Sequence, residues 1–229
     1  YITVNAVNDE PVIDGISDPA AILEDAGLQT INLTGIGDGD ADVTQSLTVT
    51  ATSSNTSLIP NPTVTYTSDN ATGSLAYTPV SDINGTAVIT VTVTDNGGTA
   101  NSGVNAKSIT FTVTVTAVND EPSFTKGSNI TVNEDSGSSS TSNWATSIST
   151  GPSDESGQTP TFSVTNNNNS LFSIQPAISS SGTLSFITAT NANGSATVTV
   201  SVSDDGGTAV SGDDDTSPNQ TFTITLTAV

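Results

Sequence analysis

The stretch GSLAYTPVSDINGTAVITVTVTDNGGTA (residues 73–100) decides the fold, because residues 182–209 repeat it as GTLSFITATNANGSATVTVSVSDDGGTA. The pentapeptide VNDEP likewise occurs at residues 7–11 and again at residues 118–122, a spacing close to the length of a small domain. Internal repeats of this kind are the signature of tandem modules. The sequence therefore predicts two modules, at residues 8–118 and 119–229, and residues 1–7 are expected to be the end of a preceding module.

Within each module, apolar and polar residues alternate with a period of two. Val91 and Val93 alternate with threonines, and so do Phe111 and Val113. Such alternation is typical of half-buried β-strands, and the Gly-containing steps between the runs indicate turns. We predict an all-β fold in which each module is an Ig-like, seven-stranded β-sandwich. In the first module the strands are expected at residues 19–23, 28–36, 45–53, 61–67, 73–79, 85–95 and 104–117.

The composition excludes several functions. The 229 residues include 23 Asp plus Glu but only two lysines, Lys107 and Lys126, and no His, so the formal net charge is −21. Such a chain repels nucleic acids and anionic membrane surfaces and favours cations as partners. Because Cys and His are both absent, no side chain is available to activate a nucleophile, and we expect neither enzyme activity nor catalytic residues.

The predicted strand order gathers the acidic residues at the ends of the modules. Because successive strands alternate in direction, every second turn lies at the same end of a sandwich. The end at which the chain leaves the first module is expected to carry Glu24, Asp25, Asp82 and Asn84, followed by Asn119, Asp120 and Glu121 of the linker. The adjoining end of the second module is expected to carry Asp154, Glu155, Asp204 and Asp205. A second cluster, at the other end of the first module, comprises Asn8, Asp9, Glu10, Asp38, Asp40, Asp42 and Asp95.

Carboxylates gathered in this way repel one another unless a cation lies among them, and we expect no basic residue to serve these clusters. Calcium accepts six to eight oxygen ligands in loose geometry, whereas magnesium demands a tighter octahedron and zinc prefers the His and Cys that are missing. A single Asp-Gly step is explained by turn chemistry alone, so the prediction depends on the clusters. We predict that these clusters bind Ca²⁺, above all at the junction around residues 118–122, through all of their named residues except Glu10 and Asp205.

Several motifs resemble the cadherin-like tandem repeats of large bacterial surface and RTX-type adhesins. They are EDAGLQ, YTPVSDING, VTVTD, VTAVNDEP and DGDAD (residues 38–42), and the resemblance covers essentially the whole chain. It implies that Glu24 and Asp82 are ligands from the first module, that Asn119 and Asp120 are linker ligands, and that Asp154, Glu155 and Asp204 are ligands from the second. In the second module SDES replaces DGDAD, and Asn191 or Asn193 stands where Asp82 and Asn84 stood.

The sequence thus predicts a calcium-stiffened extracellular spacer or adhesion repeat of a long, secreted bacterial surface protein, monomeric as this fragment. One alternative is a module that binds a carbohydrate or a protein, and another is homophilic adhesion between identical arrays. Trp144 could be a sugar-stacking platform, but we expect it to be an inward-facing strand residue. The threonine ladders resemble ice-binding faces, although outward-facing threonine is ordinary on a sandwich strand.

Overall fold

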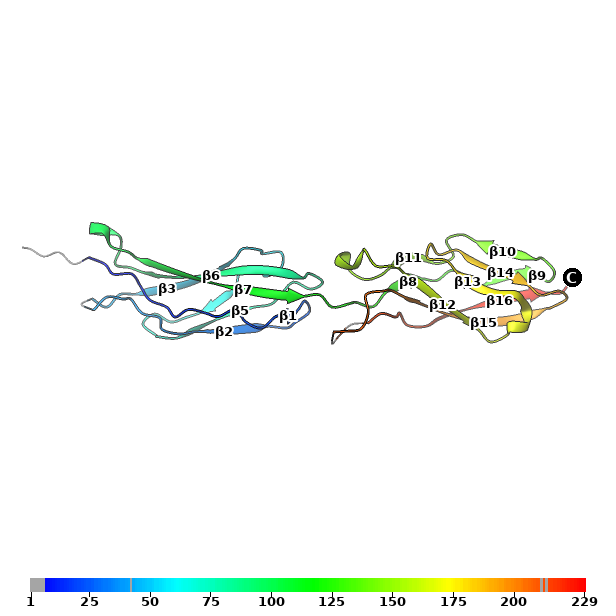
Figure 1. Ribbon diagram of the computed structural model, residues 1–229, viewed down its shortest axis with the longest axis horizontal. Coiled ribbons are helices and arrows are strands. Elements are labelled where there is room, and N and C mark those ends of the chain that lie inside the picture. The colour runs from blue at the N-terminus through cyan, green and yellow to red at the C-terminus, as the bar shows by residue number, and fades with distance from the viewer. Residues whose placement is uncertain (1–6, 42, 211, 213) are drawn as a thin grey trace, which may run out of the picture. The chain divides into compact units, whose positions relative to one another are not determined.

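The computed structural model describes residues 7–41, 43–210, 212 and 214–229. The chain forms two compact units, of which the first ends at Ala117 and the second is Val118–Val229 (Figure 1). Regular structure in the described ranges is β-strand apart from three short 3-10 turns. None of the described helices is long and apolar enough to cross a membrane. Residues 1–6 of the expected preceding module, and the predicted ligand Asp42, lie outside the described residues.

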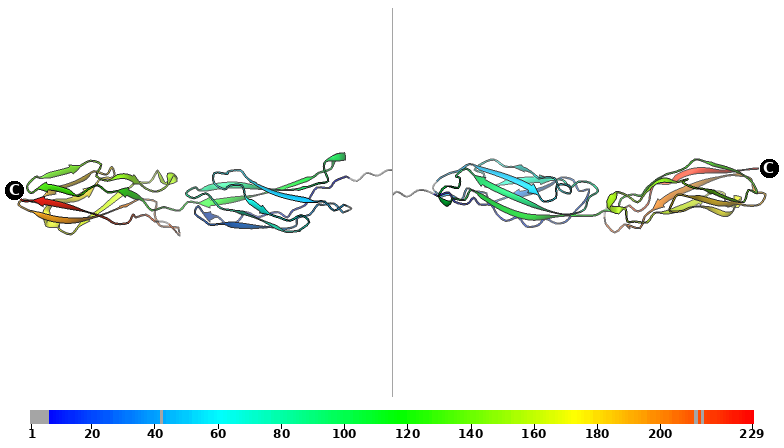
Figure 2. Two further views of the ribbon diagram at one scale, coloured as in Figure 1. Left: turned by 180° about the vertical axis from the view of Figure 1, so that it is seen from behind. Right: turned by 90° about the horizontal axis from the view of Figure 1, so that it is seen from above.

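In the first unit two sheets face each other (Figures 1 and 2). One sheet has the strand order β1 (Ile22–Leu23), β7 (Ala106–Thr116), β6 (Gly85–Asp95) and β3 (Leu47–Ser53). The other has the order β2 (Gln29–Leu33), β5 (Gly73–Tyr77) and β4 (Thr63–Thr65). Each of these strands lies within one of the ranges that the alternation predicts.

The core of the first unit fills the space between its sheets. Ile89, Val91 and Val93 on β6 are fully buried, whereas the threonines between them are partly exposed. Successive side chains of a strand point to opposite faces, so this pattern places the valines inward and the threonines outward. The predicted period of two is confirmed here.

The first and last strands of the first unit run parallel, and this pairing places the acidic turns. Ile22 is the register partner of Val115, and Leu23 that of Thr116. Earlier in β7, the Thr112 N–H donates a hydrogen bond at 2.6 Å to Oδ1 of Asp18, which precedes β1. The turn after β1 therefore lies at the end where β7 finishes, which we call the C-terminal end of the unit. The opposite end is its N-terminal end.

The second unit repeats this plan with more strands in its described residues. Its larger sheet has the order β12 (Thr161–Asn166), β15 (Gly194–Ser203), β16 (Gln220–Thr227) and β9 (Ile130–Asn133), with β9 parallel to β16. A three-stranded sheet has the order β10 (Ser138–Thr141), β14 (Leu184–Thr188) and β13 (Phe172–Ile178), and β11 (Thr146–Ser149) pairs with β8 (Ser123–Thr125). The described part of this unit therefore has nine strands instead of the predicted seven, because β8 and β11 form an additional pair where the first unit has only an isolated bridge between Val12 and Gly37.

Trp144 lies between β10 and β11 and belongs to the core of the second unit. Its side chain is 3% exposed, and its ring centroid lies 4.2 Å from that of Phe222. Its Nε1 donates a hydrogen bond to the carbonyl of Ser128 at 2.9 Å. The predicted inward orientation is confirmed, although the residue is not in a strand. A ring this buried offers no stacking surface to a sugar.

Candidate metal sites at the ends of the units

At the N-terminal end of the second unit, Asn119 forms hydrogen bonds with two loops. Its Nδ2 donates to Asp204 Oδ1 at 3.1 Å and to the Asp214 carbonyl at 3.0 Å. Its Oδ1 accepts a hydrogen bond from Gln158 Nε2 at 2.7 Å. Its carbonyl accepts another from the Asp214 N–H at 2.8 Å. The side chain and the backbone of Asn119 are therefore both fixed to the end of the unit.

Gly206 permits this close approach. A Cβ at this position would lie 1.7 Å from Asn119 Oδ1 and 2.6 Å from Gln158 Nε2, far inside van der Waals contact. The Gly206 N–H also donates to Asp204 Oδ1 at 3.0 Å. Asp204 Oδ1 thus has two donors, while its buried Oδ2 has no hydrogen-bond partner in the described part of the chain.

A 3-10 turn, η2 (Ser153–Glu155), places Glu155 inside the same end of the unit, where it is 5% exposed. Glu155 Oε1 accepts a hydrogen bond from the Asp120 N–H at 2.8 Å, and Thr150 Oγ1 donates to the Glu155 carbonyl at 2.9 Å. Gly151, with φ +145°, leaves room for Glu155 Oε2, because a Cβ there would lie 1.5 Å from that oxygen. Glu155 Oε2 is buried and accepts no hydrogen bond from the described residues.

The surroundings of Glu155 raise the pKa of its carboxyl group. Burial raises the pKa of its carboxyl group, and the charges of Asp120, Asp154 and Asp204 raise it further. The hydrogen bond from the Asp120 N–H opposes this rise in pKa but does not outweigh it. Desolvation and like charges both disfavour the carboxylate, and a nearby cation would reverse the balance.

These carboxylate oxygens have the character of metal ligands. A buried polar atom without a partner is costly, and such atoms are rare in folded proteins unless an ion or water satisfies them. The chain has no arginine, and Lys126 of this unit donates instead to the carbonyl of Thr221. Asp204 Oδ2 and Glu155 Oε2 are hard oxygen donors, which suit Ca²⁺.

The N-terminal end of the first unit has the same arrangement. Asn8 Nδ2 donates to Asp95 Oδ1 at 3.0 Å and to the Val104 carbonyl at 2.7 Å. Asn8 Oδ1 accepts from Gln45 Nε2 at 2.5 Å, and the Gly97 N–H donates to Asp95 Oδ1 at 2.9 Å. Asp95 is 5% exposed, and its Oδ2 is buried without a donor from the described residues. The same four residue types, Asn, Gln, Asp and Gly, therefore form the same geometry at aligned positions of the two repeats.

Gln45 also brings two further predicted residues to this end. Its backbone N–H donates to Asp38 Oδ2 at 2.9 Å, and its Nε2 donates to Asp40 Oδ2 at 2.7 Å. The expectation that no basic residue serves these clusters is wrong for Glu10, because Lys107 Nζ lies 2.8 Å from Glu10 Oε2. These side chains are 40% and 45% exposed, and ion pairs between exposed side chains stabilise weakly.

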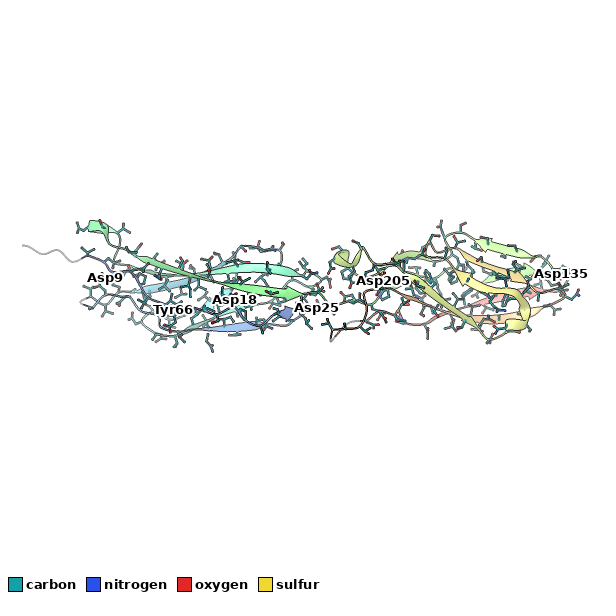
Figure 3. All side chains as sticks on the ribbon, viewed as in Figure 1. Asp9, Asp18, Asp25, Tyr66, Asp135 and Asp205 are labelled. Carbon is teal, nitrogen blue, oxygen red and sulfur yellow. The ribbon has the colours of Figure 1, made fainter. Side chains whose placement is uncertain are left out.

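The C-terminal end of the first unit carries a third group of predicted residues. Glu24 is fully buried, and its N–H donates to the Thr116 carbonyl at 3.1 Å, where β7 ends. Asp25 and Asp82 are exposed, and a carboxylate oxygen of one lies within 4.8 Å of a carboxylate oxygen of the other. Asp25 and Asp9 mark opposite ends of this unit (Figure 3). Asn84 is exposed near the same end as Asp82.

The C-terminal end of the second unit differs in charge and bonding. Asn191 stands where Asp82 stood, and its N–H donates to Asp135 Oδ1 at 2.8 Å. Glu134 Oε2 accepts from Asn193 Nδ2 at 3.2 Å. One carboxylate oxygen each of Asp135 and Glu134 thus already accepts a hydrogen bond, from a backbone N–H and from a side-chain amide.

The structure divides the predicted ligands between the ends of the two units. It brings Asn119, Asp120, Glu155 and Asp204 together, whereas Asp154, Glu121 and Asp9 are exposed. That the linker residues share ions with Glu24, Asp25 and Asp82 remains a prediction. Sequence reasoning missed Gln45 and Gln158, although both open aligned segments, QSLTV and QTPTF, in the two repeats.

Replacing Glu155 by Gln should flatten the pH dependence of stability in EDTA. Because the pKa of Glu155 is raised, the folded state binds this proton more tightly than the unfolded chain does. Its contribution to the free energy of unfolding is therefore fully present below the unfolded pKa and is lost as pH rises through the folded pKa. Melting temperatures measured across this window should fall less for Glu155→Gln than for the wild type. The exposed control Glu121→Gln should follow the wild type, and identical profiles for all three proteins would contradict the assignment.

No protein-family model matches the chain, and no curated protein matches it. Among solved structures, it is similar to extracellular cadherin domains 1–5 of protocadherin gamma B2, with a TM-score of 0.58 and 15% identity over 98% of this chain and 41% of that chain. It is also similar to EC1–2 of human protocadherin-24, with a TM-score of 0.55 and 16% identity over 97% of this chain and 100% of that chain. For mouse cadherin-23 EC22–24 the TM-score is 0.50, with 17% identity over 97% of this chain and 65% of that chain. Likeness at these identities shows the fold, and the chain has a cadherin-like β-sandwich fold.

Proposed function

We propose that this chain is a calcium-binding, adhesion-type spacer repeat of an extracellular protein. The observation that carries the proposal is the set of buried carboxylate oxygens without a donor among the described residues, namely Asp95 Oδ2, Glu155 Oε2 and Asp204 Oδ2. They lie at the N-terminal ends of both units, and Asp95 and Asp204 occupy aligned positions of the repeat. A cation at each end would replace the missing donors and offset the like-charge repulsion.

Calcium fits these ends better than other ions do. The candidate ligands are carboxylates on loops and a 3-10 turn, and calcium tolerates such irregular oxygen geometry. Zinc would require nitrogen or sulfur ligands, and the chain has neither His nor Cys. A protonated Glu155 alone would leave Asp95 and Asp204 unexplained.

We further propose that ions at the junction connect the two units. The last residue of β7 is Thr116, and Asn119 follows only three positions later, so the linker is short. Glu24, Asp25 and Asp82 at the C-terminal end of the first unit would then complete a coordination sphere begun by Asp120, Glu155 and Asp204. Ions shared in this way would stiffen the joint and make an array of repeats rigid and extended.

The proposed location is outside the cell, on a long bacterial surface protein. The similar solved structure of protocadherin gamma B2 consists of extracellular cadherin domains. The internal repeat suits an array in which each module contacts only its neighbours. A polysaccharide or protein ligand would bind to other parts of such a protein. The spacer would hold those parts at a distance from the cell surface.

Calorimetric titration of the full chain with calcium tests the proposal. We expect saturable binding that matched magnesium and sodium do not reproduce. Asp95→Asn and Asp204→Asn should each weaken or abolish one class of sites, because each removes the charge of a carboxylate whose Oδ2 is buried. Asp205→Asn removes the same charge from an exposed neighbour and should leave binding nearly unchanged. If Asp204→Asn and Asp205→Asn weaken calcium binding equally, the binding depends on surface charge and not on a defined site.

A further inference from the structure

Gln45 and Gln158 occupy the same place in the two units, where each donates to the linker asparagine. Gln45 is 6% exposed, and Gln158 is partly buried. In both residues Nε2 donates to the asparagine Oδ1, at 2.5 Å in the first unit and 2.7 Å in the second. Glutamate has nearly the same size as glutamine and would add one more anionic ligand at this position. Glutamine instead supplies an N–H donor.

The donor determines which way the asparagine amide faces. An asparagine side chain has one accepting atom and one donating atom, and either can face a given neighbour. Because Gln158 offers an N–H to Asn119 Oδ1, the Asn119 Nδ2 must face Asp204. The Asn119 Nδ2 also donates to the Asp214 carbonyl, so the glutamine and this carbonyl together orient the amide.

The amide in turn selects the free oxygen of the aspartate. Asp204 Oδ1 receives the Asn119 Nδ2 and the Gly206 N–H, so Oδ2 is the oxygen that stays without a donor among the described residues. The first unit repeats this pattern, in which Asp95 Oδ1 receives Asn8 Nδ2 and the Gly97 N–H. A rotation of either carboxylate would break two hydrogen bonds.

We propose that Gln45 and Gln158 are positioning residues, each of which helps to orient an asparagine amide so that Asp95 or Asp204 presents its buried Oδ2 to a cation. This inference rests on the calcium binding proposed above. It assigns to each glutamine a task that depends on its N–H donor and not on charge or size.

The inference predicts an effect opposite in sign to that of simple electrostatics. Gln158→Glu adds a negative charge beside the site, which by Coulomb attraction alone would tighten cation binding. The new carboxylate would instead accept from Asn119 Nδ2 and turn Asn119 Oδ1 toward Asp204, where two acceptors oppose each other. The aspartate would lose its fixed orientation, and calcium binding would weaken.

Calcium titrations of the full chain with Gln158→Glu, Gln158→Leu and the control Gln175→Glu test the inference. Changes in groups that orient metal ligands typically weaken metal affinity by about 10- to 100-fold, and we expect this for Gln158→Glu, with a smaller loss for Gln158→Leu. Gln175 is exposed on β13 and bonds to Asn166 and Asn169, so Gln175→Glu should bind calcium as the wild type does. Trp144 fluorescence in EDTA shows whether the second unit of each variant remains folded.

The outcomes separate this inference from the proposed function. Wild-type binding together with unchanged or tighter binding by Gln158→Glu would overturn the positioning role and leave calcium binding intact. If Gln158→Glu does not fold, Gln158→Leu decides, since unchanged affinity in that variant also overturns the role. A wild-type chain that takes up no calcium would refute the proposed function, and the positioning role with it.

Discussion

Calcium is expected to raise the melting temperature of this chain by about 10 °C or more. An ion that binds only the folded state stabilises it by about 2.7 kcal/mol at a hundredfold excess over Kd. For a domain of roughly 100 residues, 1 kcal/mol corresponds to about 4 °C or more. Scanning calorimetry in EDTA and across a calcium series measures the shift.

Two controls give this experiment its meaning. Matched magnesium and sodium separate a specific site from the screening of a net charge of −21. The single tryptophan lies in the core of the second unit, so its fluorescence follows that unit while calorimetry follows both. A shift that sodium reproduces in full would show that the acids form only a solvated, salt-sensitive surface.

Gly206→Ala is expected to cost the second unit most of its calcium affinity. The added methyl group would lie 1.7 Å from Asn119 Oδ1, so Asn119 must move away from Asp204 and Gln158. Asp204 Oδ1 would lose one of its two donors, and the linker would lose its attachment to the unit. By analogy with other groups that orient metal ligands, we expect a loss of about 10- to 100-fold in affinity, measured by calorimetric titration.

Gly157→Ala is the matched control for this substitution. Gly157 also lies in a loop of the second unit, but nothing stands within 4 Å of a Cβ built there, and its backbone has no positive φ. The same methyl group should therefore leave calcium affinity unchanged. If both variants bind like the wild type, the contact between Gly206 and Asn119 does not matter for the site.

The fold was largely predictable because the alternation of apolar and polar residues is a local pattern that occurs in both repeats. The alternation of Val91 and Val93 with threonine specifies a strand with one buried face, and the structure buries both valines completely. The division into β10 and β11 was not predictable in this way. The run from residue 138 to residue 149 lacks a clear period of two, and the buried Trp144 interrupts it.

The sequence predicted the acidic residues of the candidate site but not the glutamines that bond to its asparagines. Asp95 and Asp204 precede Gly-containing turns in the two repeats, and their charge identified them as candidate ligands. Gln45 and Gln158 carry no charge, and their role exists only once a distant asparagine lies beside them. Asp154 and Glu155 could not be told apart in sequence, because the 3-10 turn decides which one is buried.

The parallel pairing of first and last strands has a mechanical consequence. When tension pulls the two ends of a unit apart, parallel neighbours are drawn past each other lengthwise, so the hydrogen bonds between them resist shear together instead of opening one by one. The second unit opposes this sliding with four register pairs between β9 and β16, from Ile130 to Asn133. The first has two such pairs between β1 and β7, supplemented by the bond from Thr112 to Asp18. Under a pulling force the first unit should therefore rupture before the second.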